Sequence, residues 1–453
     1  WGLQSLSQIL IESASKAEGG QLKLAGLEIE DWPEFAYRGA MLDCCRHFIP
    51  FEDVKKYIDI MAYHKLNTFH WHLTEDQGWR IEIKKYPLLT EIGSKREDTL
   101  VNHLREKEEN RVYDGHPHSG FYTQEQAREL VAYAAARQIT VIPEIEMPGH
   151  AEAALASYPY LGCRQTGYVT LPVWGIIPEV FCMGRESTFK FFEDVLDEIC
   201  EIFPGEYIHI GGDEVGMKGW LSCPHCSALM RERGFTDPKQ LEDLFMKRVT
   251  DLVKSKCKTP VAWWDKDVIT DTFTKESLVC AWQDIPACRN AMAKGYRTVF
   301  MSAWHLYFDM KQGPHDPGQD WGGLIDCRRV YDLDLGRLGV TDSEKYAVIG
   351  YEGAFWAETH LQNNPECPDY LDFMLWPRAA ALGAMAWGKK LSTDCFMEYM
   401  RTRHYPRLSA MGVAFRLPEP SVNWENGVLT ASAETGATIL YRKDGDRAKV
   451  YDR

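Results

Sequence analysis

The sequence lacks several features that would assign it to a class at once. No apolar run in its 453 residues approaches the ~18 residues that a membrane-spanning helix needs. No N-x-[ST] acceptor for N-glycosylation occurs, which weighs against a glycosylated exported protein of a eukaryote. Lysine and arginine total only 51 against 66 acidic residues, a formal charge of −15. That excess of negative charge disfavours nucleic acid and anionic lipid as partners.

Cysteine usage offers no disulfide framework. The 13 cysteines are scattered through a long chain, unlike those of a small disulfide-stapled fold. Cys223 and Cys226, in "CPHC", form the one C-x-x-C pair, and half of a zinc site is one interpretation of it. Because no second pair of cysteines or histidines stands at metal-ligand spacing, we expect no metal and no cofactor.

Short apolar runs alternate with longer amphipathic segments after Tyr37. The amphipathic segments include Glu52–His64, Thr123–Ala136, Thr188–Ile202 and Pro238–Lys256. The strand-like runs are Gly39–Asp43, Thr68–Leu73, Thr140–Ile145, Tyr207–Gly211, Pro260–Trp264, Leu278–Trp282, Thr298–Ser302 and Ala347–Tyr351. Eight strands alternating with helices predict an α/β fold, a (β/α)8 TIM barrel over residues 37–415. A doubly wound open sheet is the alternative, but the first strand–helix turn has no G-x-G-x-x-G phosphate loop.

The two segments that flank the predicted barrel have different sequence patterns. Residues 1–36 begin with helical spacing of Leu3, Leu6 and Ile9 and are too few to fold alone, so we expect the tail of an N-terminal α/β domain. Residues 416–453 alternate apolar and polar positions, with Gly and Asn at turns, and predict the start of a small C-terminal β module. The chain begins with Trp1 and looks trimmed, so a missing signal peptide does not reveal the compartment.

Polar and aromatic side chains follow every predicted strand. In a TIM barrel the catalytic groups lie just past the carboxyl ends of the strands, so these side chains are expected to meet at one rim. In strand order they are Asp43 and Arg46; His70, His72, Glu75 and Asp76; Glu144, Glu146 and His150; Asp213 and Glu214; Trp264; Trp282; Tyr307 and Asp309; and Trp356 and Glu358. Their convergence predicts an active site at that rim.

The end of the fourth strand, "HIGGDE", carries the sharpest signal. Its two glycines allow close approach to a bound group, and Asp213 and Glu214 follow at once. Adjacent carboxylates point in different directions, so one can protonate a leaving group while the other stabilises charge elsewhere. The alternative is a helix N-terminus capped by two acids. The nearby aromatic residues suit a sugar, whose C–H faces pack on flat rings and whose hydroxyls need polar partners.

Six motifs together resemble the exo-acting β-N-acetylhexosaminidases of glycoside hydrolase family 20. They are "YRGAMLDCCRHF", "KLNTFHWHLTEDQGWRIEI", "VIPEIEMPGHAEAAL", "YIHIGGDE", "YFD" and "EGAFWAE", and the match runs from about Leu3 to about Gly412. The resemblance implies retaining hydrolysis of terminal β-linked GlcNAc or GalNAc from an oligosaccharide or glycoconjugate. It also implies that the attacking atom is the substrate's own acetamido oxygen, which forms an oxazolinium ion.

The resemblance also implies a role for each matching residue. Glu214 acts as the general acid/base, Asp213 orients the acetamido group, and Tyr307 hydrogen-bonds its carbonyl. Ring hydroxyls are held by Arg46, Asp309 and Glu358; the pocket walls are Trp264, Trp282 and Trp356, with Trp321 at the edge; and His150 supports Glu214 from behind. Glu75 and Glu146 stand where family members usually carry Asp, so each is longer by one methylene.

Two other classes of function remain open at this point. His70 and His72 form an H-x-H pair on a strand, as in metal-dependent barrel amidohydrolases, although no complete ligand set follows. A glycan-binding protein without catalysis would also use aromatic walls, but it would not need the Asp213–Glu214 pair. From the family resemblance we expect an extracytoplasmic location in a bacterium: periplasmic, cell-surface or secreted.

Overall fold

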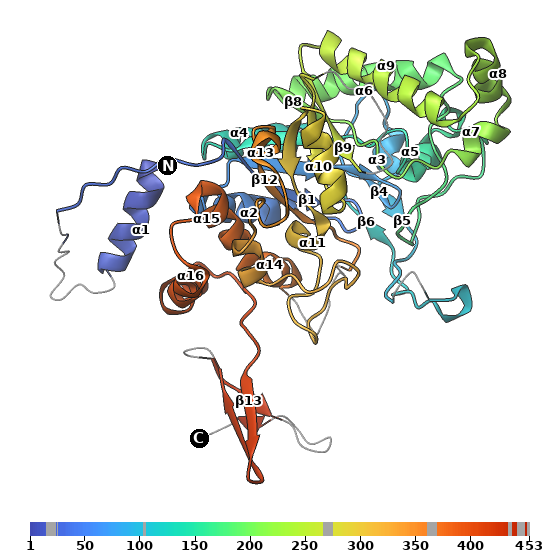
Figure 1. Cartoon of the computed structure of the whole chain (residues 1–453). Helices are drawn as coiled ribbons and strands as arrows, with labels where there is room; N and C mark the ends of the chain where they lie inside the picture. The colour runs from blue at the N-terminus through green and yellow to red at the C-terminus, as the bar shows by residue number, and fades with distance from the viewer. Residues whose placement is uncertain are drawn as a thin grey trace.

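Eight parallel strands close into a barrel in the computed structural model, which describes residues 1–14, 24, 26–102, 106–265, 275–359, 369–433, 437–441 and 449–450 (Figure 1). Around the barrel the strands follow the order β1, β12, β11, β10, β9, β8, β7, β2. They span Tyr37–Asp43 (β1), Thr68–His72 (β2), Thr140–Glu144 (β7), Tyr207–His209 (β8), Thr259–Trp264 (β9), Leu278–Ala281 (β10), Arg297–Phe300 (β11) and Val348–Phe355 (β12). The predicted TIM barrel is confirmed.

Amphipathic helices cover the outside of the barrel. All four that the sequence predicts are present, as α2 (Phe51–Tyr63), α4 (Gln124–Ala135), α6 (Glu186–Ile202) and α9 (Lys239–Ser255). Helix α4 begins where Thr123 and Gln126 form a reciprocal capping box. Two further covering helices are α10 (Ile285–Ala293) and α15 (Arg378–Gly388), whereas the described residues between β9 and β10 form no helix.

Shorter elements occupy the loops between strands and helices. At the carboxyl end of the barrel they include β3 (Thr74–Glu75), β4 (Gly78–Trp79), α5 (Glu152–Ser157), η2 (Pro159–Leu161), α7 (Lys218–Ser222), α8 (Pro224–Arg233) and α11 (Ala303–Leu306). The others are α3 (Leu88–Glu91), β5 (Lys95–Arg96), η1 (Glu108–Asn110), β6 (His118–Ser119), α12 (Cys327–Tyr331), α13 (Asp342–Lys345), α14 (Tyr370–Leu375), α16 (Thr393–Tyr399), the π-helix η3 (Met400–His404) and α17 (Tyr405–Ala410). In the described part of the chain, no helix has the length and apolarity to cross a membrane.

The barrel strands are buried on both faces, as expected of a parallel sheet covered by helices. Alternate residues therefore divide between the barrel interior and the layer beneath the helices. On β2, Phe69 packs against Tyr57 of α2, whereas His70 and His72 meet carboxylates from β7 and β12 inside the barrel. The polar side chains of β2 therefore lie on the interior face of the barrel, toward its carboxyl end.

The flanking segments lie outside this core. Helix α1 (Gly2–Ala14) runs beside the barrel, with Leu3 exposed and with the Gln8 amide donating to the Tyr63 carbonyl (Figure 1). An antiparallel hairpin of β13 (Ser421–Glu425) and β14 (Val428–Ser432) projects from the other end, followed by β15 (Leu440–Tyr441) and β16 (Lys449–Val450). Assigning these segments to neighbouring domains, over residues 1–36 and 416–453, stays a prediction.

Candidate active site

One cavity at the carboxyl end of the barrel collects side chains from the ends of seven strands. The residues that the family resemblance places at the site all line it except Trp264, and Glu146 joins them. Five other residues expected at the rim do not line it: Asp43, His70, His72, Asp76 and Glu144. The lining residues are Arg46, Glu75, Glu146, His150, Asp213, Glu214, Trp282, Tyr307, Asp309, Trp321, Trp356 and Glu358. Six carboxylates within one small cavity are costly to desolvate, so this assembly points to a functional site rather than to packing.

The Gly-Gly turn after β8 aims Asp213 and Glu214 into the cavity. Gly211 and Gly212 have φ of 63° and 100°, and Glu214 itself lies in the left-handed region at 51°. A Cβ on Gly211 would lie 1.7 Å from a Glu146 carboxylate oxygen, so any other residue there would displace that carboxylate and strain the left-handed backbone. Non-glycine residues in this backbone region are uncommon, and such strain concentrates at functional sites.

His150 connects this acidic pair to a second one. Its Nδ1 lies 2.7 Å from Glu75 Oε1, and its Nε2 lies 3.9 Å from Asp213 Oδ2 and 3.7 Å from Glu214 Oε2. Burial alone would lower the pKa of His150, but the Glu75 and Asp76 carboxylates more than offset this and hold it well above its usual range. His150 is therefore a cation that steadies the two carboxylates in front of it.

Both members of the acidic pair bind protons more tightly than ordinary carboxyls. Burial raises the pKa of Asp213 to about 8, against the opposing pull of His150 and with help from neighbouring Glu214. Burial likewise raises the pKa of Glu214. An acid whose pKa is raised toward neutrality can deliver a proton to a leaving group and take one back.

Arg46 is fixed at the opposite wall by two carboxylates. Its guanidinium lies 3.4 Å from Asp43 Oδ2 and 3.0 Å from Glu75 Oε2, and its Cζ stands 4.9 Å from the centre of the Trp356 ring. Asp43 is itself held by the backbone N–H groups of Cys45 and Ala357. The Glu75 side chain, one methylene longer than the usual Asp, thus reaches both Arg46 and His150.

Aromatic rings form the walls of the cavity. Trp282 and Tyr307 stack with ring centres 6.1 Å apart and planes 13° from parallel, and Tyr307 lies 5.9 Å from Trp356. Trp321 packs edge-on against Tyr307 and is 39% exposed, which places it at the mouth. Flat, largely buried rings beside carboxylates suit a ligand with both apolar faces and hydroxyl groups.

Several buried polar atoms at the cavity have no hydrogen-bond partner among the described residues. They include Asp213 Oδ1, Asp309 Oδ1, Glu146 Oε2 and the Trp282 indole nitrogen. Buried polar groups in proteins nearly always have partners, so a ligand rich in donors and acceptors, or ordered water, must supply them. Burial also raises the pKa of Glu358 to about 7 and that of Asp309 well above its usual range, so a protonated carboxyl at either position can donate a hydrogen bond to a hydroxyl as well as accept one.

Trp264 does not face the cavity, and the structure corrects its predicted place in the sugar pocket. It is fully buried outside the barrel, 5.0 Å from the ring of Tyr296 and beneath Lys294. The preceding residue, Trp263, points inward, donates to Glu146 Oε1 at 3.2 Å and lies 5.7 Å from Trp356. Neighbouring residues of a strand point to opposite faces, so the prediction named the outward-facing one of two adjacent indoles.

His70 and His72 belong to a buried charge network below the cavity. His70 lies between Glu144 and Glu352, at 3.0 and 2.7 Å, and His72 lies between Glu144 and Glu75. The two imidazoles are at most 1% exposed. A catalytic metal needs an open coordination position for water, which ligands enclosed in this way do not leave. The H-x-H pair of His70 and His72 therefore no longer supports the alternative function of a metal-dependent amidohydrolase.

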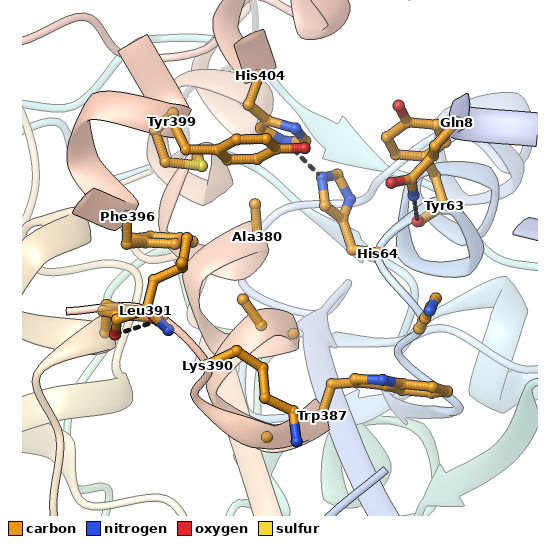
Figure 2. Close-up of a pocket in the computed structure, with 16 residues that line it drawn as sticks. Gln8, Tyr63, His64, Ala380, Trp387, Lys390, Leu391, Phe396, Tyr399 and His404 are labelled. Atoms are coloured by element: carbon orange, nitrogen blue, oxygen red, sulfur yellow. Dashed lines mark hydrogen bonds between the residues drawn. The ribbon is translucent and has the colours of Figure 1, made fainter. Parts of the chain in front are cut away.

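A second cavity lies at the opposite, amino-terminal end of the barrel, between α1, α2, α15 and α16 (Figure 2). Its centre is the His64–His404 pair, whose Nε2 atoms are 2.9 Å apart. Burial lowers the pKa of both histidines, to about 4 for His64, so they are neutral, and His64 stacks on Trp376. Side chains at this end of a TIM barrel serve stability, and these pack as part of the core.

Comparison with known proteins identifies relatives of the whole barrel. The family described as "Glycosyl hydrolase family 20, catalytic domain" matches residues 35–390. A "Beta-hexosaminidase" of Porphyromonas gingivalis is 38% identical over 429 residues, covering 93% of this chain and 52% of the relative. One of Vibrio furnissii is 37% identical over 382 residues, covering 83% and 60%. The chain thus spans about half the length of these relatives.

Solved structures of similar proteins share the fold. A family 20 exo-β-N-acetylglucosaminidase from Vibrio harveyi, in complex with N-acetylglucosamine, is 34% identical with a TM-score of 0.72, covering 85% of this chain and 59% of that one. A β-N-acetylhexosaminidase from Streptomyces coelicolor is 32% identical with a TM-score of 0.75, covering 94% and 79%.

Proposed function

The chain belongs to glycosyl hydrolase family 20, and from this premise we propose that it removes terminal, non-reducing β-linked N-acetylhexosamine (GlcNAc or GalNAc) from glycans. One observation carries the proposal: Asp213 and Glu214, both with raised pKa, face a cavity whose walls are Trp282, Tyr307 and Trp356. The names of the relatives from P. gingivalis and V. harveyi support the same activity, and the latter supports exo action.

The cavity suits a single aminosugar ring. The C–H faces of a pyranose pack on the indole planes, while Arg46, Asp309 and Glu358 offer hydrogen-bonding partners for its hydroxyls. Tyr307 stays protonated, because burial and the nearby Asp213 raise its pKa well above its usual range. Its hydroxyl can therefore donate to the acetamido carbonyl, while Asp213, in the ionised form that the neighbouring His150 favours, accepts from the acetamido N–H.

The first chemical step uses a nucleophile that belongs to the substrate. The acetamido oxygen attacks the anomeric carbon, the bond from that carbon to the glycosidic oxygen breaks, and Glu214 transfers its proton to the departing oxygen. Family 20 is an exception to the scheme with a carboxylate nucleophile for this reason. Asp213, within 3.9 Å of the His150 imidazole, stabilises the positive charge of the oxazolinium ion.

The second step reverses the proton transfer. Glu214, now a carboxylate, takes a proton from water as the water oxygen attacks the anomeric carbon and the bond to the acetamido oxygen breaks. Two inversions at one carbon give net retention. The substrate recovers its acetamido group and Glu214 its proton, so the enzyme needs no carboxylate nucleophile and no cofactor in this scheme.

A panel of aryl β-glycosides tests the proposal. We expect hydrolysis of the GlcNAc and GalNAc derivatives and no comparable turnover of the β-glucoside, which has no acetamido group to attack. A cyclic thiazoline that mimics the oxazolinium ion should inhibit competitively. Efficient cleavage of the β-glucoside, or a sugar trapped as an ester on a protein carboxylate, would contradict substrate-assisted hydrolysis.

A further inference from the structure

Four cysteines from three separate segments meet beside the loops that follow β7 and β8. Cys163 lies just after η2, Cys182 lies before α6, and Cys223 and Cys226 stand at the start of α8. Their sulfur atoms all lie within 4.8 Å of one another. The Cys182 sulfur lies 3.7 Å from that of Cys223 and 3.6 Å from that of Cys226, which lies 3.8 Å from that of Cys163.

These separations fit a metal centre and not disulfides. A disulfide needs sulfur atoms ~2.05 Å apart, far closer than any of these pairs. Tetrahedral zinc with Zn–S bonds of ~2.3 Å has its sulfur atoms about 3.8 Å apart. We propose that Cys163, Cys182, Cys223 and Cys226 bind one structural zinc ion.

The surroundings are those of a closed metal site. Cys182 and Cys226 are fully buried, Cys223 is nearly so and Cys163 is partly buried. Four cysteine ligands complete a tetrahedral shell, which leaves no open position for a substrate or catalytic water. Gly184 packs against the start of α8, where a Cβ on it would lie 2.5 Å from the Cys226 nitrogen. This close approach packs the loop before α6 against the start of α8, so the segments that carry Cys182 and Cys226 lie in direct contact.

Charge in the cluster also favours a cation. The start of α8 (Pro224–Arg233) directs its positive end toward the cluster and favours thiolates there. Zinc binds thiolates and releases the remaining thiol protons when it binds.

The sequence shows only half of this arrangement. The "CPHC" pair is visible, but Cys163 lies 63 positions before Cys226, and Cys182 lies 41 before Cys223. Each of these two ligands is a lone cysteine in the chain, so spacing rules gave no second pair. The expectation that the chain binds no metal rests on that spacing, and this proposal replaces it.

Zinc at this position would fasten the loop after β7 to the loop that carries Asp213 and Glu214. Direct contacts already join them: the Trp220 indole donates to the Phe181 carbonyl at 2.9 Å, and a Cβ on Gly216 would lie 2.6 Å from Pro178. A tetrahedral clamp across the same two loops would stabilise them by restricting their separation. The ion is structural, because the closed ligand set lies outside the catalytic cavity.

Metal analysis of the purified full chain tests the proposal directly. After expression with zinc and dialysis against a weak chelator, we expect one zinc per chain. Titration with an organomercurial should release it as the cluster thiols react. Cys226→Ser should lose the zinc and unfold at a lower temperature, whereas Cys200→Ser, which changes a cysteine of α6 outside the cluster, should retain both zinc and stability.

Three results would overturn the proposal. They are a wild-type chain without zinc under these conditions, undiminished zinc in Cys226→Ser, and disulfides joining the four cysteines in a peptide map made without reducing agent. Should Cys226→Ser fail to fold, cobalt(II) in the wild-type chain decides: tetrahedral thiolate ligation gives intense sulfur-to-metal charge-transfer absorption, and its absence contradicts the site. None of these measurements depends on glycosidase activity.

Discussion

Asp213 and Glu214 are neighbours in the chain, yet the structure gives them different surroundings. The side chain of Asp213 is 12% exposed and that of Glu214 is 28% exposed. The left-handed backbone at Glu214 turns the two carboxylates apart, while His150 faces both. The more enclosed Asp213 is suited to stabilise charge, and the more open Glu214 is suited to exchange protons with a leaving group and water.

Replacing Glu214 tests the proton transfer. We expect Glu214→Ala to lower kcat/KM for a β-N-acetylglucosaminide with a poor leaving group by about 10²–10⁴-fold, the usual contribution of a general acid. An activated dinitrophenyl glycoside needs little protonation, so its loss should be much smaller. The measurement is kcat/KM for both substrates, and an equal loss for the two would argue against Glu214 as the acid.

We expect Asp213 to make the folded chain less stable as the pH rises. Its pKa is raised from an ordinary 3.8 to about 8, so between these values the folded chain binds more protons than the unfolded chain, and stability falls with increasing pH. Asp213→Asn removes this dependence. We expect its Tm to exceed that of the wild type at pH 8, and the difference to vanish near pH 4. Its kcat should fall about 10²–10³-fold.

Thermal unfolding across this pH range measures the effect. Asp251→Asn is the matched control, because Asp251 is an exposed acid of α9 paired only with Lys247 in the described structure. A difference between Asp213→Asn and wild type that grows toward low pH would have the wrong sign for this account.

At the scale of the element, the alternation of strand β9 decides which indole contacts the residues that line the cavity. Trp263 and Trp264 are adjacent and both buried, but only Trp263 faces Glu146 and Trp356. We expect Trp263→Phe to lower kcat/KM at least tenfold per folded molecule. Trp264→Phe should lower Tm and leave kcat/KM within about twofold, because it removes only packing against Tyr296. The reverse pattern would contradict the inward placement of Trp263.

The turn after β8 allows a similarly matched pair of glycine substitutions. Gly211→Ala adds a Cβ where a Glu146 oxygen lies 1.7 Å away and φ is 63°, so we expect a lower Tm and severe loss of activity. Gly219→Ala, in α7, meets only a Val180 methyl at 3.9 Å and should be neutral or slightly stabilising. Tm and kcat of both variants check this, and a stable, active Gly211→Ala would contradict the described turn.

At the scale of the whole molecule, much of the architecture could be predicted from sequence. Alternating runs located all eight barrel strands, and the rule that catalytic groups follow strand ends located eleven of the twelve cavity residues, whereas Trp321 came only from the family resemblance. The spacing of apolar residues along the chain is a local property, so it can be recognised in the sequence without knowledge of the three-dimensional structure. The eighth strand was placed at 347–351, although β12 runs to Phe355 and includes part of the motif expected to follow it.

What the sequence could not provide are properties set by tertiary contacts. Whether Trp263 or Trp264 points inward depends on the register of β9 with its neighbours, which residue types alone do not fix. The meeting of Cys163 and Cys182 with the "CPHC" pair depends on how two long loops pack. The extracytoplasmic location remains a prediction from family resemblance.

The central claim is that the acetamido oxygen of the substrate is the attacking atom, and changing the basicity of that oxygen tests it most directly. Successive fluorination of the acetyl group makes the oxygen a poorer nucleophile and changes the sugar's shape little. We predict that kcat/KM for aryl glycosides falls steeply from N-acetyl through N-fluoroacetyl and N-difluoroacetyl to N-trifluoroacetyl. A rate that stays nearly constant across the series would contradict the account.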